Sequence, residues 1–282
     1  MSAIILKVLS GALLGISLGT ATALAQGGGG SRDTTVTYVE QPGGIDLADY
    51  VAAWPALAPY VVRLRQGGRD AVKSDLQRLA QSASPPEGAL NLLAQLDRED
   101  GRLDESRVLI ERAVAANRDQ HLHYFQQAMV AFAQLSRASG LGRWTWQQKT
   151  RAAYQRAFDL DPRPVPYRFY LVYSLAQTPG FAGGDKDRAL RMADEGVGMG
   201  EKAFYVVRAD VHRFRGERAL AFADYDRAIE ERVFKLNAFL AAGDLAAEQQ
   251  DWPRARRYLE WAVHCRPDSP TARAKLAALP GQ

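Results

Sequence analysis

Apolar residues recur along most of the chain three and four positions apart, the spacing that places them on one face of a helix. Short turns separate these helical stretches, often at a glycine such as Gly101 or Gly216. Alternating apolar and polar runs, which mark strands, are missing from the sequence between residues 45 and 282. The pattern therefore predicts an all-α protein.

The helical pattern also returns at a fixed interval. Ala221 and Ala255 are 34 residues apart in the sequence, and so are Ala228 and Ala262. A period of about 34 residues is that of a repeated helix–turn–helix unit. Small residues recur where two helices would approach each other closely, and larger residues fill the spaces between them. No single hairpin can bury its apolar face alone, so units of this kind must stack.

With these residues, the chain resembles an exported bacterial tetratricopeptide-repeat (TPR) protein. The most complete unit follows the expected small and large positions in order, with only Ala242 smaller than the pattern requires, at Phe239, Ala242, Gly243, Ala246, Ala255, Leu259, Ala262 and Pro267. The resemblance implies a right-handed TPR superhelix, an α-solenoid of about five helical hairpins over residues 87–267. We expect an N-terminal helical cap or degenerate repeat at 45–86, and a C-terminal capping helix and tail at 268–282. Two units contain extra residues, 136–145 and 178–185, which we expect to form loops on one edge of the stack.

The first residues have the features of a secretory signal peptide. Lys7 precedes an apolar stretch, and Ala23 and Ala25 provide the small side chains that signal peptidase requires. We expect a signal peptide over 1–25 and a flexible, glycine-rich tether over 26–44, which would place the mature protein in the periplasm or outside the cell. An uncleaved membrane anchor is the alternative. Thr34–Val39 alternates weakly, with no second strand expected to pair with it.

Charge and candidate chemistry narrow the classes of function. The chain has 36 basic and 32 acidic residues, and the two signs are interleaved as on solvated helix faces, so we expect no nucleic-acid partner. His121 and His123 are two positions apart and point in different directions on a helix, so they cannot share a metal. Cys265, the only cysteine, has no nucleophile motif around it, and the glycines at 180–184 lack the spacing of a phosphate-binding loop. We expect no enzyme activity, no cofactor and no metal.

The resemblance also implies a binding groove on the concave side, lined by the first helix of each hairpin. Projecting the groove positions of the TPR onto the chain gives these candidate binding residues: Asn91, Gln95, Arg98, Phe125, Met129, Phe132, Asp210, Arg213, Asn237 and Asp244. The apolar stripe Phe125, Met129 and Phe132 allows two interpretations. It packs under the 136–145 insertion, or it forms a pocket for an apolar side chain of a partner.

These expectations favour a non-catalytic scaffold that binds a protein or peptide on its concave face, with the identity of the partner unknown. Two alternatives stay open. One is a membrane-tethered TPR adaptor in envelope assembly or secretion. The other is a soluble carrier of a small ligand, with a pocket that would add Tyr167, Phe169 and Tyr170 to the apolar stripe.

Overall fold

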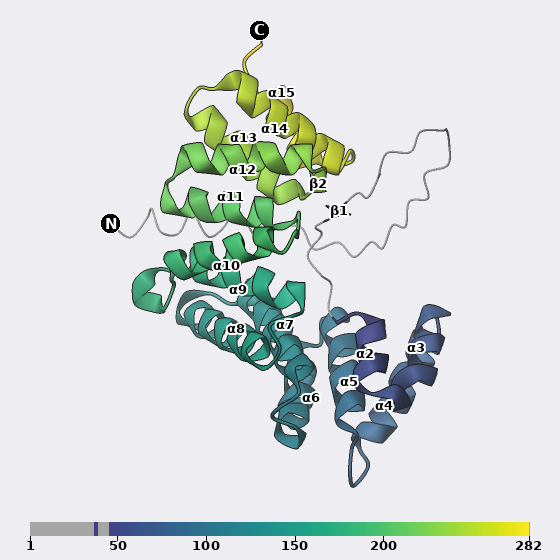
Figure 1. Ribbon diagram of the computed structural model, residues 1–282. Coiled ribbons are helices and arrows are strands. Elements are labelled where there is room, and N and C mark those ends of the chain that lie inside the picture. The colour runs from purple at the N-terminus through teal and green to yellow at the C-terminus, as the bar shows by residue number, and fades with distance from the viewer. Residues whose placement is uncertain (1–36, 39–44, 282) are drawn as a thin grey trace. The chain divides into compact units, whose positions relative to one another are not determined.

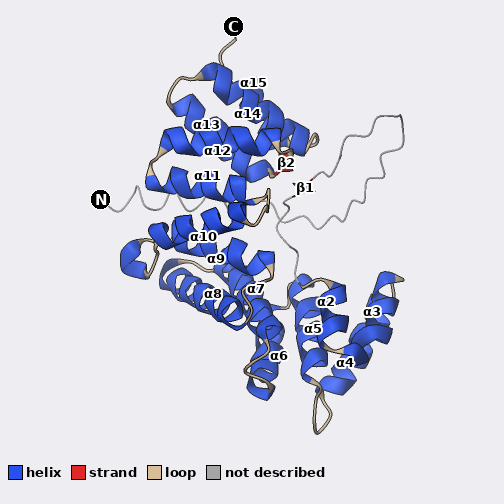
Figure 2. Ribbon diagram, in the orientation of Figure 1, coloured by secondary structure: helices blue, strands red, loops and turns tan. Residues whose placement is uncertain are grey.

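The computed structural model describes residues 37–38 and 45–281. The expected signal peptide at 1–25 and nearly all of the expected tether at 26–44 lie outside the described residues. Helices dominate the described part of the chain (Figure 2), which contains the fourteen α-helices α2 to α15. The chain divides into two compact units, one formed by residues 44–192 and the other by residues 193–282 with the strand β1.

The unit of residues 44–192 begins with three short helices. These are α2 (Leu47–Ala53), α3 (Ala58–Arg65) and α4 (Arg69–Ala80), with a 3₁₀ turn at Pro55–Leu57. The break falls at Pro55 because proline has no N–H with which to continue the bonds of α2. Two hairpins and a further helix follow (Figure 1): α5 (Glu87–Glu99) with α6 (Leu103–Ala116), α7 (His121–Arg137) with α8 (Gly140–Leu160), and α9 (Val165–Gln177). The division between the units falls inside α10 (Lys186–Gly198).

The unit of residues 193–282 contains two further hairpins and a final helix. They are α11 (Phe204–Arg215) with α12 (Arg218–Glu230), α13 (Leu236–Glu248) with α14 (Trp252–Cys265), and α15 (Pro270–Ala277). The four alanines that define the 34-residue period are fully buried. At Gly243 an added Cβ would lie 2.7 Å from the side chain of Leu259, so the hairpin needs a residue without a side chain there. The predicted helical repeat is confirmed.

The two insertions differ from each other in structure. The expected loop at 136–145 is wrong, because α7 continues to Arg137 and α8 begins at Gly140. Proline is absent from this stretch, so the additional residues lengthen both helices. The expected loop at 178–185 is confirmed, and it contains a 3₁₀ turn at Gly180–Ala182. Asp185 then caps α10, since its Oδ1 accepts a hydrogen bond from the backbone N of Arg188 at 2.8 Å.

A small strand pair corrects the expectation that Thr34–Val39 has no partner. The strand β1 (Thr37–Tyr38) pairs in parallel with β2 (Val233–Phe234), the segment between α12 and α13. Backbone groups of the connection between two hairpins therefore pair with a segment from near the start of the chain.

Candidate partner-binding surface

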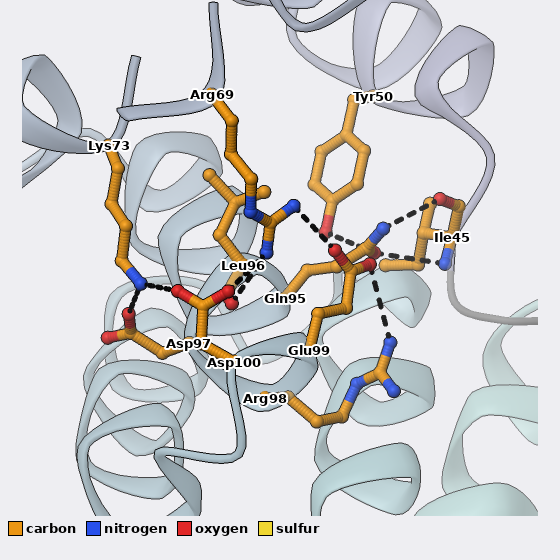
Figure 3. Close-up of polar contacts among 10 residues, drawn as sticks. All are labelled: Ile45, Tyr50, Arg69, Lys73, Gln95, Leu96, Asp97, Arg98, Glu99 and Asp100. Atoms are coloured by element: carbon orange, nitrogen blue, oxygen red, sulfur yellow. Dashed lines mark hydrogen bonds and ion pairs between the residues drawn. The ribbon is translucent and has the colours of Figure 1, made fainter. Parts of the chain in front are cut away.

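The first helix of the first hairpin, α5, carries buried polar side chains that bind Ile45 and Tyr50, at and just before the helix α2 (Figure 3). Tyr50 of α2 is fully buried, and its hydroxyl donates to Asn91 Oδ1 at 2.8 Å and lies 3.1 Å from Gln95 Oε1. Gln95 also holds the backbone of Ile45, accepting from its N at 3.0 Å and donating to its O at 3.3 Å. Asn91 and Gln95 are four residues apart, so one face of α5 makes all of these contacts.

A second aromatic residue of the same segment, Trp54, lies against the start of α5 and α7. Its Nε1 donates to Glu87 Oε1 at 2.9 Å, and its ring stacks on His123 with centroids 5.3 Å apart. The Trp54 ring packs directly against Gly88, where an added Cβ would lie 2.5 Å from Trp54 Cγ. Asn117 donates to the same Glu87 oxygen at 3.2 Å. The interaction of α2 with the repeats is therefore anchored at both ends of the helix.

Burial fixes the protonation of the titratable groups in this contact. Burial raises the pKa of Tyr50 well above its ordinary range, so its hydroxyl stays protonated and able to donate. Burial also lowers the pKa of His123, although Glu87 acts in the opposite direction. Asn91 Nδ2 donates to His123 Nδ1 at 2.7 Å, so the neutral ring carries its proton on Nε2. That nitrogen lies 3.7 Å from Glu87 Oε2.

Ion pairs hold α4 to the C-terminal end of α5 (Figure 3). Arg69 contacts Glu99 at 2.9 Å and Asp100 at 2.8 Å, and it donates to the carbonyl oxygen of Leu96 at 3.0 Å. Lys73 is paired with Asp97 at 2.9 Å and also with Asp100. These contacts fix the helices that follow α2, and so they limit how far α2 can move from α5.

This arrangement changes the interpretation of three predicted groove residues. Asn91 is 0% and Gln95 7% exposed, so the expectation that they lie open to a partner is wrong. The reason is that α2 covers them and uses their side-chain amides. Arg98, whose side chain is 12% exposed, lies 3.8 Å from Glu99. Its charge opposes the rise that burial causes in the pKa of Tyr154.

The predicted apolar stripe on α7 is divided by burial. Phe125 is buried, and its ring centroid lies 4.7 Å from that of Tyr167 and 6.0 Å from those of Tyr154 and Tyr170. Met129 is buried as well, with its sulfur 3.4 Å from the Tyr154 hydroxyl. Tyr154 of α8 and the two tyrosines of α9 therefore cover Phe125 and Met129, so both residues belong to the core. The cover comes from these rings and not from a loop at 136–145. Phe132 continues the stripe and stays partly exposed.

The predicted groove residues of the last two hairpins are more accessible. Asp210 is buried, accepting from the Tyr225 hydroxyl at 2.6 Å and from Arg213 Nη2 at 3.1 Å. Arg213 is partly exposed, and Asn237 and Asp244 are exposed. Asp244 accepts from Lys275 of α15 at 2.6 Å. Candidate residues for contact with a partner in this unit therefore lie on α11 and α13.

The described residues show little that suggests catalysis. No group of three or more His, Cys, Asp or Glu side chains within residues 45–281 is arranged to hold a metal. His121 and His123 have separate partners, since His121 Nδ1 lies 2.7 Å from the Tyr167 hydroxyl. Burial raises the pKa of the Cys265 thiol to about 12, so this thiol is protonated at neutral pH and is a poor nucleophile. Among the helices described, none is long and apolar enough to cross a membrane.

The fold is shared with solved TPR structures. A tetratricopeptide repeat protein from Parabacteroides merdae ATCC 43184 aligns with a TM-score of 0.54 at 15% identity, over 82% of this chain and 88% of that one. A chain of the APC/C hetero-tetramer Cut9-Hcn1 aligns with a TM-score of 0.56 at 13% identity, over 82% of this chain and 44% of that one. No family model and no curated protein matches the chain. The chain therefore has the all-α TPR solenoid fold.

The repeat pattern could not identify the residues that cover the first hairpin, because Tyr50 and Trp54 lie before the repeats. Two signals in the sequence point to them. The aromatic residues are four positions apart, as on one helix face, and Gly88 interrupts the first turn of a helix. Neither signal names the surface to which the aromatic residues bind.

Proposed function

We propose that the chain is an exported, non-catalytic scaffold that binds a protein or peptide through the first helices of its repeats. The observation that carries this proposal is the stack of TPR hairpins, since stacked repeats create an extended surface of helix faces. Lys7, Ala23 and Ala25 support export. The exposed Asn237 and partly exposed Arg213 make α11 and α13 the preferred contact surface.

Site-specific photo-crosslinking tests the proposal. A photoreactive amino acid replaces Asn237 on α13 in the full chain, and the matched control carries it at the exposed Glu260 on α14. We expect a defined adduct with an envelope protein from position 237 and none from position 260. The same set of adducts from both positions, or none from position 237, would count against this surface.

Localisation is tested separately. N-terminal sequencing of the mature protein should begin at Gln26, after the Ala23 and Ala25 signal. An intact Met1 in the envelope fraction would instead support the membrane-tethered adaptor.

A further inference from the structure

The surface between α5 and α7 contains buried polar atoms without hydrogen-bond partners among the described residues. Gln126 is fully buried, and both its Oε1 and its Nε2 lack such a partner. His123 Nε2 has only the longer contact with Glu87 Oε2, at 3.7 Å. Gln126 lies three positions after His123 on α7, and the ring of His123 contacts Asn91 and Trp54. Because an unpaired buried polar group opposes folding, the packing around this part of α7 leaves hydrogen-bonding capacity unused.

The segment that covers the surface binds in the way a short peptide ligand would. The helix α2 has seven residues, too few to be stable alone in water. Its two anchors are Tyr50 within the helix and Trp54 at its C-cap, four positions apart, with ring centroids 5.8 Å from each other. Before them Gln95 contacts both the N–H and the C=O of Ile45. On the side of Ile45 this contact uses only backbone groups, while the Ile45 side chain is buried in the core.

We propose that the face of α5 and α7 is a recognition site for a partner segment with two aromatic side chains four residues apart on a helical turn. In the free protein α2 occupies this site as an internal competitor. The Tyr50 position requires a hydroxyl to satisfy the amides of Asn91 and Gln95, and the Trp54 position requires a flat ring that donates to Glu87. This inference rests on the proposed scaffold function and names the chemistry of the partner.

The test uses the full mature chain and a fluorescent synthetic peptide with the sequence of residues 45–54. In one variant, Tyr50→Ser and Trp54→Ser remove both anchors and vacate the site. We expect this variant to bind the peptide at least about tenfold more tightly than the wild-type chain, because the internal competitor is gone. A peptide with the same two serine substitutions should not bind. Adding Gly88→Ala to the vacated variant should abolish binding, because the new Cβ fills the seat of the Trp54 ring.

Two results would overturn the inference. One is a folded, vacated variant that binds the peptide no better than the wild type. The other is equal binding of the intact and the serine-substituted peptide. If the vacated variant does not fold, hydrogen exchange in the wild-type chain decides the matter. Excess peptide should then speed exchange of the α2 amides and leave α14 unchanged, and the absence of that change would overturn the inference.

Different results would refute the proposed scaffold function and the proposed aromatic site. A partner captured at Asn237, together with no binding of the peptide to the vacated variant, would refute the aromatic site and leave the scaffold in place. Binding of the peptide with no partner captured at Asn237 would leave the site intact and count against α11 and α13 as the contact surface.

Discussion

The first and last hairpins are built on the same repeat, yet their first helices have different surroundings. On α13 the predicted groove residues Asn237 and Asp244 are exposed. On α5 the predicted groove residues Asn91 and Gln95 are buried, because α2 lies over them and contacts both amides. The inner contacts of the two regions are nevertheless alike, with small residues fully buried between the paired helices.

This difference separates two properties of a repeat. The spacing of small and large residues determines how the two helices of a hairpin pack, because that packing is local. Whether a groove is open depends on the rest of the chain, since any segment with suitable anchors can cover it. Groove residues projected from a repeat pattern are therefore positions on a helix face rather than exposed sites.

The largest expected effect is in the core of the second hairpin. Phe125→Ser should lower the free energy of unfolding by about 3–5 kcal/mol, because it removes a buried ring from among three tyrosines. Phe132→Ser, on the same helix but partly exposed, should cost clearly less. Urea unfolding of both variants gives the comparison, and equal losses would place Phe125 on an open surface.

A larger side chain at a small-residue position of the last hairpin tests the repeat register. Ala255 is fully buried and Ala115 is exposed. Ala255→Leu should destabilise the protein by about 1–3 kcal/mol, because the added carbons have no space between the helices. Ala115→Leu should have almost no effect. Thermal melting of the two variants measures the difference, and identical melting temperatures would contradict the register.

The sequence could predict the hairpins because each depends on residues at most 34 positions apart. Ser106 shows how local these contacts are, since its Oγ donates to the carbonyl oxygen of Ala94, 12 residues earlier, at 2.6 Å. The contact of Tyr50 with Asn91 spans 41 residues and follows no period, so no pattern predicted it. The helical form of residues 136–145 was missed because the standard repeat has a short turn there.

A gain in stability should follow from replacing the unpaired side-chain amide of Gln126 on α7. Gln126→Leu replaces both orphan polar atoms with apolar ones of similar volume, and it should raise the free energy of unfolding by about 1–3 kcal/mol. Gln127→Leu, on the partly exposed neighbouring position, should bring no such gain. Chemical denaturation checks both variants. A clear loss of stability in Gln126→Leu would mean that the amide is hydrogen-bonded in solution.

A smaller effect of pH should be confined to the hairpins that α2 covers. Burial lowers the pKa of His123, so below its ordinary value of about 6.5 the unfolded chain binds a proton more readily than the folded one. The contribution of His123 to stability is therefore complete above about pH 6.5 and is lost as the pH falls toward its lower folded value. His123→Gln should reduce this loss, whereas His264→Gln, at an exposed site, should not. Parallel pH series of melting temperature would refute this assignment if both variants kept the wild-type slope.

Amide hydrogen exchange on the full chain tests most directly whether α2 covers the first hairpin. A seven-residue helix has almost no stability of its own, so protection of the amides from Tyr50 to Trp54 reports docking. We predict clear protection in the wild type. Tyr50→Phe, which takes away the hydroxyl bonded to Asn91 and Gln95, should weaken this protection selectively, leaving α13 and α14 unchanged. Exchange of these amides in the wild type at the rate of an unstructured peptide would contradict the account.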